Sequence, residues 1–304
     1  MNFMYPEIDL QAAWPGGAAA PSGLGLAGAT AGAGHPELDL NDPQTNLMAM
    51  LKIRADLSGA DCHFAFPGEV WAMIPQEGNF RLFKTFGFAS TRIEEAPEGW
   101  RMYNREVLYY MDPDSGEILS EWRNPLLDNR LVEVVHIAND PVNGVFTADG
   151  AGVLSAPYPY IAYGDDLIFQ WNFFIFHAAA MSRRDYPLYS AGDIDQHAEL
   201  WGVQGRISEV LNPDITSGAC TMSWSRVSQW MPWLEMGNSP GVTVYHSHTY
   251  KMMNGPQELP PHIYAHTEKY FPRYFEAPTE WNGPEMQSSA SVFKAMVDER
   301  RREE

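Results

Sequence analysis

The chain has 304 residues and a formal net charge of −19, from 39 acidic and 20 basic residues. Such a charge repels phosphate backbones and anionic lipid surfaces, so we expect neither nucleic acid nor a membrane as a partner. The chain has no run of about eighteen apolar residues, which also argues against a membrane span. Two cysteines, Cys62 and Cys220, are too few for a disulfide scaffold.

The N-terminal part differs in composition from the rest. Residues 12–34 are rich in alanine and glycine and carry no charge. Such a segment buries too little surface to offset its conformational entropy. We therefore expect residues 1–40 to form a flexible arm, and residues 41–304 to form a single β-rich domain with short N-terminal and C-terminal helices.

Helices are predicted at both ends of this domain. Asp42 followed by Pro43 is typical of a helix start, and apolar residues then follow at helical spacing, which predicts a helix over residues 43–57. Residues 288–304 have the spacing of an amphipathic helix. Residues 193–211 fit a helix and a strand equally well.

Between the two ends the hydrophobic period is two, which predicts strands. A hairpin is expected from residues 102–111 and 117–122, and further strands from residues 131–137, 142–147, 167–177 and 242–252. Short connections favour antiparallel pairing and disfavour a Rossmann sheet, and the sequence lacks a glycine-rich nucleotide motif. We expect a mainly β fold: a large antiparallel, barrel-like (lipocalin- or calycin-like) sheet with a few flanking α-helices, able to hold one small ligand.

Residues 221–241 contain three tryptophans, Trp224, Trp230 and Trp233, and three methionines between small polar residues. Rigid aromatic surfaces of this kind suit either a pocket wall or a packed core. The segment resembles a motif of the uncharacterised family domain of unknown function 1838, and the resemblance extends to residues 66–72, 103–119 and 122–125 and to Lys251 and residues 258–260. The resemblance implies no function, because none is assigned to the family. Members often carry a twin-arginine leader; this chain lacks one, so we expect a cytoplasmic protein.

Two histidines are candidates for chemistry. His246 and His248 are two residues apart on an expected strand, so both face the same side, together with Tyr250. On an interior face they would suit acid–base catalysis. They would also suit metal binding with further ligands, and the candidates are Glu69, Asp195, His197 and His136. An exposed or core pair without function is the remaining alternative.

Other polar residues interrupt apolar strands. Tyr103 and Arg105 share a face, and a buried arginine there needs a carboxylate partner such as Glu69, or one from a ligand. Asn172 beside Trp171 needs a partner if buried. Arg226 lies within the tryptophan motif, and His136 precedes a polar cluster. His262 and His266 are spaced by about one turn of a helix, and we expect both on an exposed helix.

The expected function is a cofactor-independent enzyme, without metal, that acts on a small aromatic molecule such as a lignin-derived phenol by lyase chemistry such as loss of formaldehyde. The expected catalytic residues are His246, His248, Arg105, Glu69 and Tyr103. The expected substrate-binding residues are Trp171, Asn172, Trp224, Arg226, Trp230, Trp233, Tyr250 and His136. A non-catalytic carrier of aromatic or lipid ligands is one alternative, and a metal-dependent oxygenase or hydrolase using His246 and His248 is another. We expect a homodimer.

Overall fold

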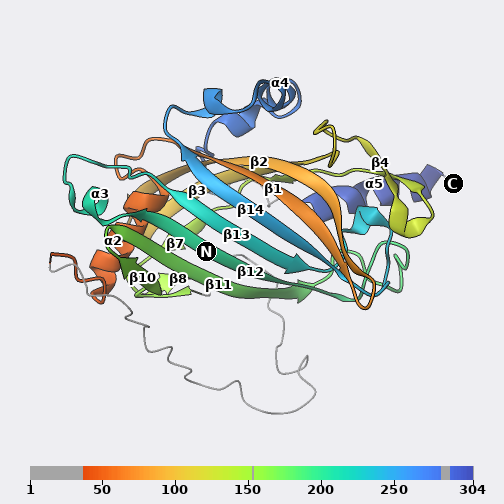
Figure 1. Ribbon diagram of the computed structural model, residues 1–304, viewed down its shortest axis with the longest axis horizontal. Helices are drawn as coiled ribbons and strands as arrows, with labels where there is room; N and C mark the ends of the chain where they lie inside the picture. The colour runs from red at the N-terminus through yellow and green to blue at the C-terminus, as the bar shows by residue number, and fades with distance from the viewer. Residues whose placement is uncertain (1–36, 153, 282–287, 304) are drawn as a thin grey trace, which may run out of the picture.

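The computed structural model describes residues 37–152, 154–281 and 288–303. The predicted arm of residues 1–40 lies almost wholly outside them. The described chain is built on one ten-stranded antiparallel sheet that curves into a trough (Figure 1). Its order is β10-β11-β12-β13-β14-β1-β2-β3-β6, and β7 also pairs with β3. The mainly β, antiparallel expectation is confirmed.

The long strands form the middle of the sheet and the short ones its edges. The long strands are β1 (Cys62–Ile74), β2 (Gly78–Ala96), β3 (Gly99–Met111), β11 (Asp166–Ala178), β12 (Ile194–Arg206), β13 (Thr221–Ser228) and β14 (Val242–Met252). The edges are β10 (Tyr160–Tyr163) on one side, and β6 (Ile137–Asn139) and β7 (Gly144–Phe146) on the other.

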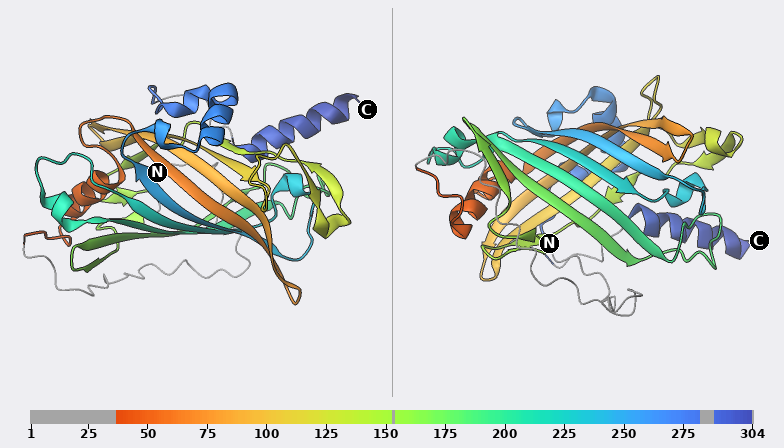
Figure 2. Two further views of the ribbon diagram at one scale, coloured as in Figure 1. Left: turned by 45° about the horizontal axis from the view of Figure 1, so that its top comes forward. Right: turned by 60° about the horizontal axis from the view of Figure 1, so that its bottom comes forward.

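The expected closure into a barrel is wrong, because the sheet stays open between these edges. The edge strands are only three or four residues long and pair on one side only. Strands this short have too few free backbone N–H and C=O groups to pair across the gap and close the sheet into a barrel. Figure 2 shows the resulting trough from two further sides.

Two local predictions need correction. Strand β4 (Glu121–Asn124) pairs with β5 (Arg130–Glu133) in a separate small sheet. The expected hairpin is therefore short: Met111 and Ile118 form an isolated bridge, Asp112 N donates to Glu117 O at 2.8 Å, and Leu119 N donates to Tyr110 O at 3.0 Å. The strand expected over residues 131–137 is divided between β5 and β6. A further two-stranded sheet joins β8 (Gly150–Ala151) to β9 (Leu154–Ser155).

The helices lie around the sheet. Helix α2 (Pro43–Arg54) begins where predicted, with the Asp42 carboxylate accepting a hydrogen bond from Thr45 N at 2.8 Å. The ambiguous residues 193–211 form strand β12 followed by helix α3 (Ile207–Leu211). Near the C-terminus come α4 (Pro261–Tyr270) and α5 (Ser289–Glu303), and α2 and α5 lie toward opposite ends of the strands (Figure 1). Among the described residues no helix is long and apolar enough to cross a membrane.

Alternation along β3 explains how the core is divided. Leu108 and Tyr110 face the concave side, whereas Val107 and Tyr109 pack under α4 on the convex side. On the concave side one apolar cluster gathers around α2 and a second around Phe293 of α5. These two clusters fill the two ends of the trough, and the polar part of its interior lies between them.

Candidate functional site

A cavity of about 520 Å³ lies on the concave side of the sheet and is lined by members of both apolar clusters. The volume is within the range of sites for small molecules. Its tryptophan, tyrosine and phenylalanine lining comes from several strands and from the segments that follow β13 and β14: Tyr110, Phe146, Trp171, Phe173, Trp201, Trp230, Trp233, Tyr245 and Phe293. Such walls suit a flat apolar ligand.

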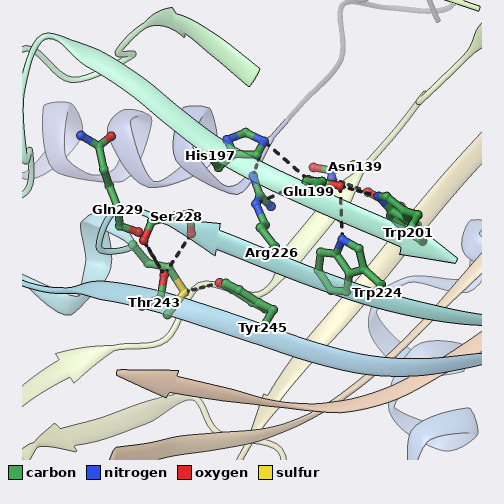
Figure 3. A network of polar contacts seen from close by, with 12 residues as sticks. Asn139, His197, Glu199, Trp201, Trp224, Arg226, Ser228, Gln229, Thr243 and Tyr245 are labelled. Atoms are coloured by element: carbon green, nitrogen blue, oxygen red, sulfur yellow. Dashed lines mark hydrogen bonds and ion pairs between the residues drawn. The ribbon is translucent and has the colours of Figure 1, made fainter. Parts of the chain in front are cut away.

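The centre of the polar lining is an ion pair between two adjacent strands. Glu199 of β12 and Arg226 of β13 are register partners, and Glu199 Oε1 lies 3.5 Å from Arg226 Nε. The other oxygen, Oε2, accepts hydrogen bonds from the indoles of Trp201 at 2.9 Å and Trp224 at 3.2 Å (Figure 3). Two hydrogen bonds thus fix the carboxylate through Oε2, and its charge pairs with the guanidinium of Arg226 at the cavity wall.

His197 completes this group. Arg226 Nη2 lies 3.0 Å from His197 Nε2 (Figure 3). A guanidinium can only donate, so Nε2 is the acceptor and the imidazole is neutral. Burial, together with the positive charge of Arg226, lowers the pKa of His197 to about 3. His197 is therefore a hydrogen-bonding group at neutral pH and a poor general base.

Two carboxyl groups of the lining are shifted toward their neutral forms. Burial raises the pKa of Glu106 on β3, and the negative charge of Glu199 raises it further. Opposing this, Asn139 Nδ2 donates to Glu106 Oε1 at 2.8 Å. Burial also raises the pKa of Asp195 on β12. A carboxylate with a raised pKa is a stronger base than an ordinary carboxylate, and its protonated form is more populated as an acid.

Two tyrosine hydroxyls meet at the same wall. Tyr110 Oη lies 2.8 Å from Tyr245 Oη, and Tyr245 Oη donates to Met231 Sδ at 2.8 Å. Burial raises the pKa of both phenols. They remain neutral and act as hydrogen-bonding groups.

Several predicted site residues do lie at this cavity. Trp171, Arg226, Trp230 and Trp233 line it. Trp224 lies behind the lining and donates to Glu199. Asp195 and His197, considered from sequence as metal ligands, also line the cavity. Within the described ranges, no three His, Cys, Asp or Glu side chains are grouped as a metal site requires.

The histidine pair lies elsewhere. His246 and His248 are exposed, and His246 Nδ1 pairs with Ser225 Oγ at 2.9 Å. Their expected interior position is wrong. A two-residue spacing puts both rings on one face without saying which face is buried, and β14 turns Tyr245 into the cavity instead.

The other expected catalytic residues also face away. Arg105 Nε pairs with Asp140 Oδ1 at 3.1 Å, and Tyr103 Oη donates to Glu94 Oε2 at 2.8 Å. The expected pairing of Arg105 with Glu69 is wrong, because Glu69 pairs with Arg81 at 3.1 Å. These side chains stabilise the outer side of β1, β2 and β3 rather than reaching the cavity.

Three expected binding residues are also outside the lining. Asn172 is exposed, and Tyr250 packs into the apolar cluster beneath α4. His136 accepts from the backbone N–H of Tyr110 at 3.1 Å, and burial, then the nearby His266, lower its pKa to about 4. His266 itself packs edge-on against Tyr109, a residue of the convex-side cluster.

The sequence interpretation missed Glu106, Asn139, Glu199 and Arg54, which all line the cavity. Glu106 directly follows Arg105 but lies on the opposite face of the same strand, and the candidates chosen from sequence, Tyr103 and Arg105, share the other face. Alternation from Tyr110 would have placed Glu106 inward. Glu199 lies in the segment that fitted a helix and a strand equally well, so its face could not be assigned.

Comparison with known proteins identifies the family of the chain but says nothing about its activity. No curated protein matches this sequence. Residues 59–297 match the family described as "Protein of unknown function (DUF1838)". This range includes strands β1 to β14 and therefore nearly all of the cavity wall. The resemblance noted in the tryptophan motif is confirmed, and the chain belongs to the DUF1838 family.

Proposed function

We propose that this chain is a cofactor-independent enzyme that acts on a small aromatic molecule by acid–base lyase chemistry, with Glu106 as its base. The observation that carries the proposal is the position of Glu106, a buried carboxyl with a raised pKa on the wall of an aromatic-lined cavity. A base is most effective when its pKa lies near the working pH.

The neighbours of Glu106 suit the charges that such a reaction develops. Arg226 lines the same cavity, where its charge lowers the pKa of Glu106 and can stabilise an alkoxide or phenolate. Asp195, also with a raised pKa, supplies a second carboxyl that can act as an acid. The tryptophan walls exclude water and hold flat rings.

Loss of formaldehyde from a lignin-derived 1,3-diol is the concrete reaction that we propose. Glu106 removes the proton of the primary alcohol, and the adjacent C–C bond breaks to release formaldehyde. The electron pair of that bond forms a C=C bond as the hydroxyl of the neighbouring benzylic carbon leaves. Asp195 protonates this hydroxyl, so the products are an alkene, formaldehyde and water, with no net oxidation or reduction.

The test uses purified protein, a chelator and a panel of phenolic diaryl 1,3-diols. The proposal predicts formaldehyde and a conjugated alkene in equal amounts, at a rate that the chelator does not change. Quenching of tryptophan fluorescence by these compounds without any product would contradict it and would support a carrier. Activity lost on chelation and restored by a metal would favour the metal-dependent alternative.

A further inference from the structure

Arg54, the last residue of α2, brings a second positive charge to the cavity. Its guanidinium stacks over the ring of Phe64, with Cζ 4.2 Å from the ring centroid. Its Nη1 atom is buried and has no hydrogen-bond partner in the part of the chain that the structure describes. Burying a charged donor without an acceptor costs free energy. Buried polar groups normally have a hydrogen-bond partner, so an acceptor is expected at this part of the cavity wall.

A second buried donor at the same cavity also lacks a hydrogen-bond partner. The indole Nε1 of Trp171 is buried and has no partner among the described residues. Trp171 and Phe64 belong to the same apolar cluster, which places Trp171 and Arg54 at the α2 end of the trough. A guanidinium and an indole N–H can only donate hydrogen bonds. What this end of the cavity lacks is therefore an acceptor.

The other cavity arginine is different, because a carboxylate already balances its charge, although its Nε also has no hydrogen-bond partner among the described residues. Arg226 has Glu199 at 3.5 Å and His197 at 3.0 Å. The charge of Glu106 raises the pKa of Arg54, but its effect is smaller than that of burial, which lowers this pKa, and smaller than those of Cys220 and Cys62. A negative group on a ligand would therefore gain more at Arg54 than at Arg226.

We propose that Arg54 and Trp171 form a carboxylate subsite, and that the natural ligand of this cavity is an aromatic carboxylic acid. The planar fork of a guanidinium matches a carboxylate, and the apolar wall of Met102, Phe146 and Trp171 matches the attached ring. This inference rests on the proposed function only in treating the cavity as the substrate site. The carboxylate lies at the α2 end, and the reacting carbons lie toward Glu106.

The test is calorimetric titration with 2-naphthoate and with its neutral amide, 2-naphthamide. The wild-type protein should bind the carboxylate at least about tenfold more tightly than the amide, as expected for hydrogen bonds to a charged group. Arg54→Met should weaken 2-naphthoate about ten- to hundredfold and change 2-naphthamide less than about twofold. Arg123→Met, which removes an exposed arginine outside the cavity lining, should change neither.

Two further measurements test whether the indole donor of Trp171 and the apolar wall contribute to binding. Trp171→Phe keeps the ring and removes the donor, and it should weaken 2-naphthoate about three- to tenfold. Inorganic phosphate should not displace 2-naphthoate, since the apolar wall contributes to binding.

Equal binding of the acid and the amide by the wild-type protein would overturn the inference without any variant. Unchanged 2-naphthoate affinity in Arg54→Met, or displacement by phosphate, would also overturn it. None of these results depends on turnover. The carboxylate subsite can therefore fail while the lyase proposal stands, and the reverse is equally possible.

Discussion

Glu199 and Arg226 face each other across strands β12 and β13, with 3.5 Å between Glu199 Oε1 and Arg226 Nε. The two indoles of Trp201 and Trp224 occupy the remaining oxygen of Glu199. This arrangement makes the carboxylate a fixed support for the arginine. Arg226 is thus held at the wall of the cavity before any ligand enters, as electrostatic stabilisation of a developing anion requires.

The first prediction concerns this support. Glu199→Ala should lower the free energy of unfolding by about 3–5 kcal/mol, because it leaves the guanidinium without its counter-charge and two indole donors without their acceptor. Chemical denaturation at pH 7 measures the change. Glu133→Ala breaks the surface pair with Arg300 and should cost no more than about 1 kcal/mol. A loss in Glu199→Ala no larger than in this control would contradict the supporting role.

A second prediction concerns the tryptophan motif. Trp233 packs against Phe83 and Tyr110, with ring centroids 5.6 Å and 5.1 Å away, and also lines the cavity. Trp233→Ala should lower the free energy of unfolding by about 3–5 kcal/mol, as for a buried aromatic residue. Thermal and chemical unfolding measure this. A stable variant that has lost only ligand binding would show that the ring serves the pocket alone.

The third prediction concerns the exposed histidines. His246→Ala and His248→Ala should each change the free energy of unfolding by less than about 0.5 kcal/mol, because both rings lie on the solvent-facing side of β14. Turnover should also stay at the wild-type level. A fall in turnover of a hundredfold or more in either variant would return the catalytic role to this pair.

The fourth prediction is a dependence of stability on pH. The pKa of His197 is about 3 in the folded protein, below its ordinary value of about 6.5 in an unfolded chain. As the pH falls below about 6.5 the unfolded chain binds a proton that the native protein does not, so stability decreases toward about pH 3.

Between about pH 6.5 and pH 3, this one histidine gives a slope of unfolding free energy against pH that approaches about 1.4 kcal/mol per pH unit. His197→Gln should reduce the slope of unfolding free energy against pH between pH 6 and pH 4.5. The replacement of the exposed His262 by Gln should leave it unchanged. An identical slope in His197→Gln and in the wild-type protein would mean that His197 is not held neutral.

Much of the fold was predictable from hydrophobic period. Alternation identified β3, β11 and β14, and Asp42 with Pro43 located the start of α2. The open sheet was not predictable, because closure depends on whether β10 can pair with β6 or β7. That depends on the length and curvature of the edge strands, which local patterns do not contain.

The site was predicted less well than the fold, for a related reason. Period-two alternation shows which residues share a face but not which face is covered. For β14 and β3 the faces chosen from sequence, those of His246 and Arg105, are the outer ones. Aromatic residues were placed better. Trp171, Trp230 and Trp233 line the cavity as expected, because large apolar rings are driven inward whichever way the polar neighbours point.

The most direct test of the account is the turnover of Glu106→Gln on a diaryl 1,3-diol that the wild-type protein cleaves. The amide keeps the shape and can still meet Asn139, but it cannot accept a proton. The account predicts a loss of about a hundredfold to ten-thousandfold in formaldehyde release, with the fold and ligand binding retained. Glu69→Gln, on the outer side of β1, should keep full activity. Full turnover by Glu106→Gln, or an equal loss in Glu69→Gln, would contradict the central claim.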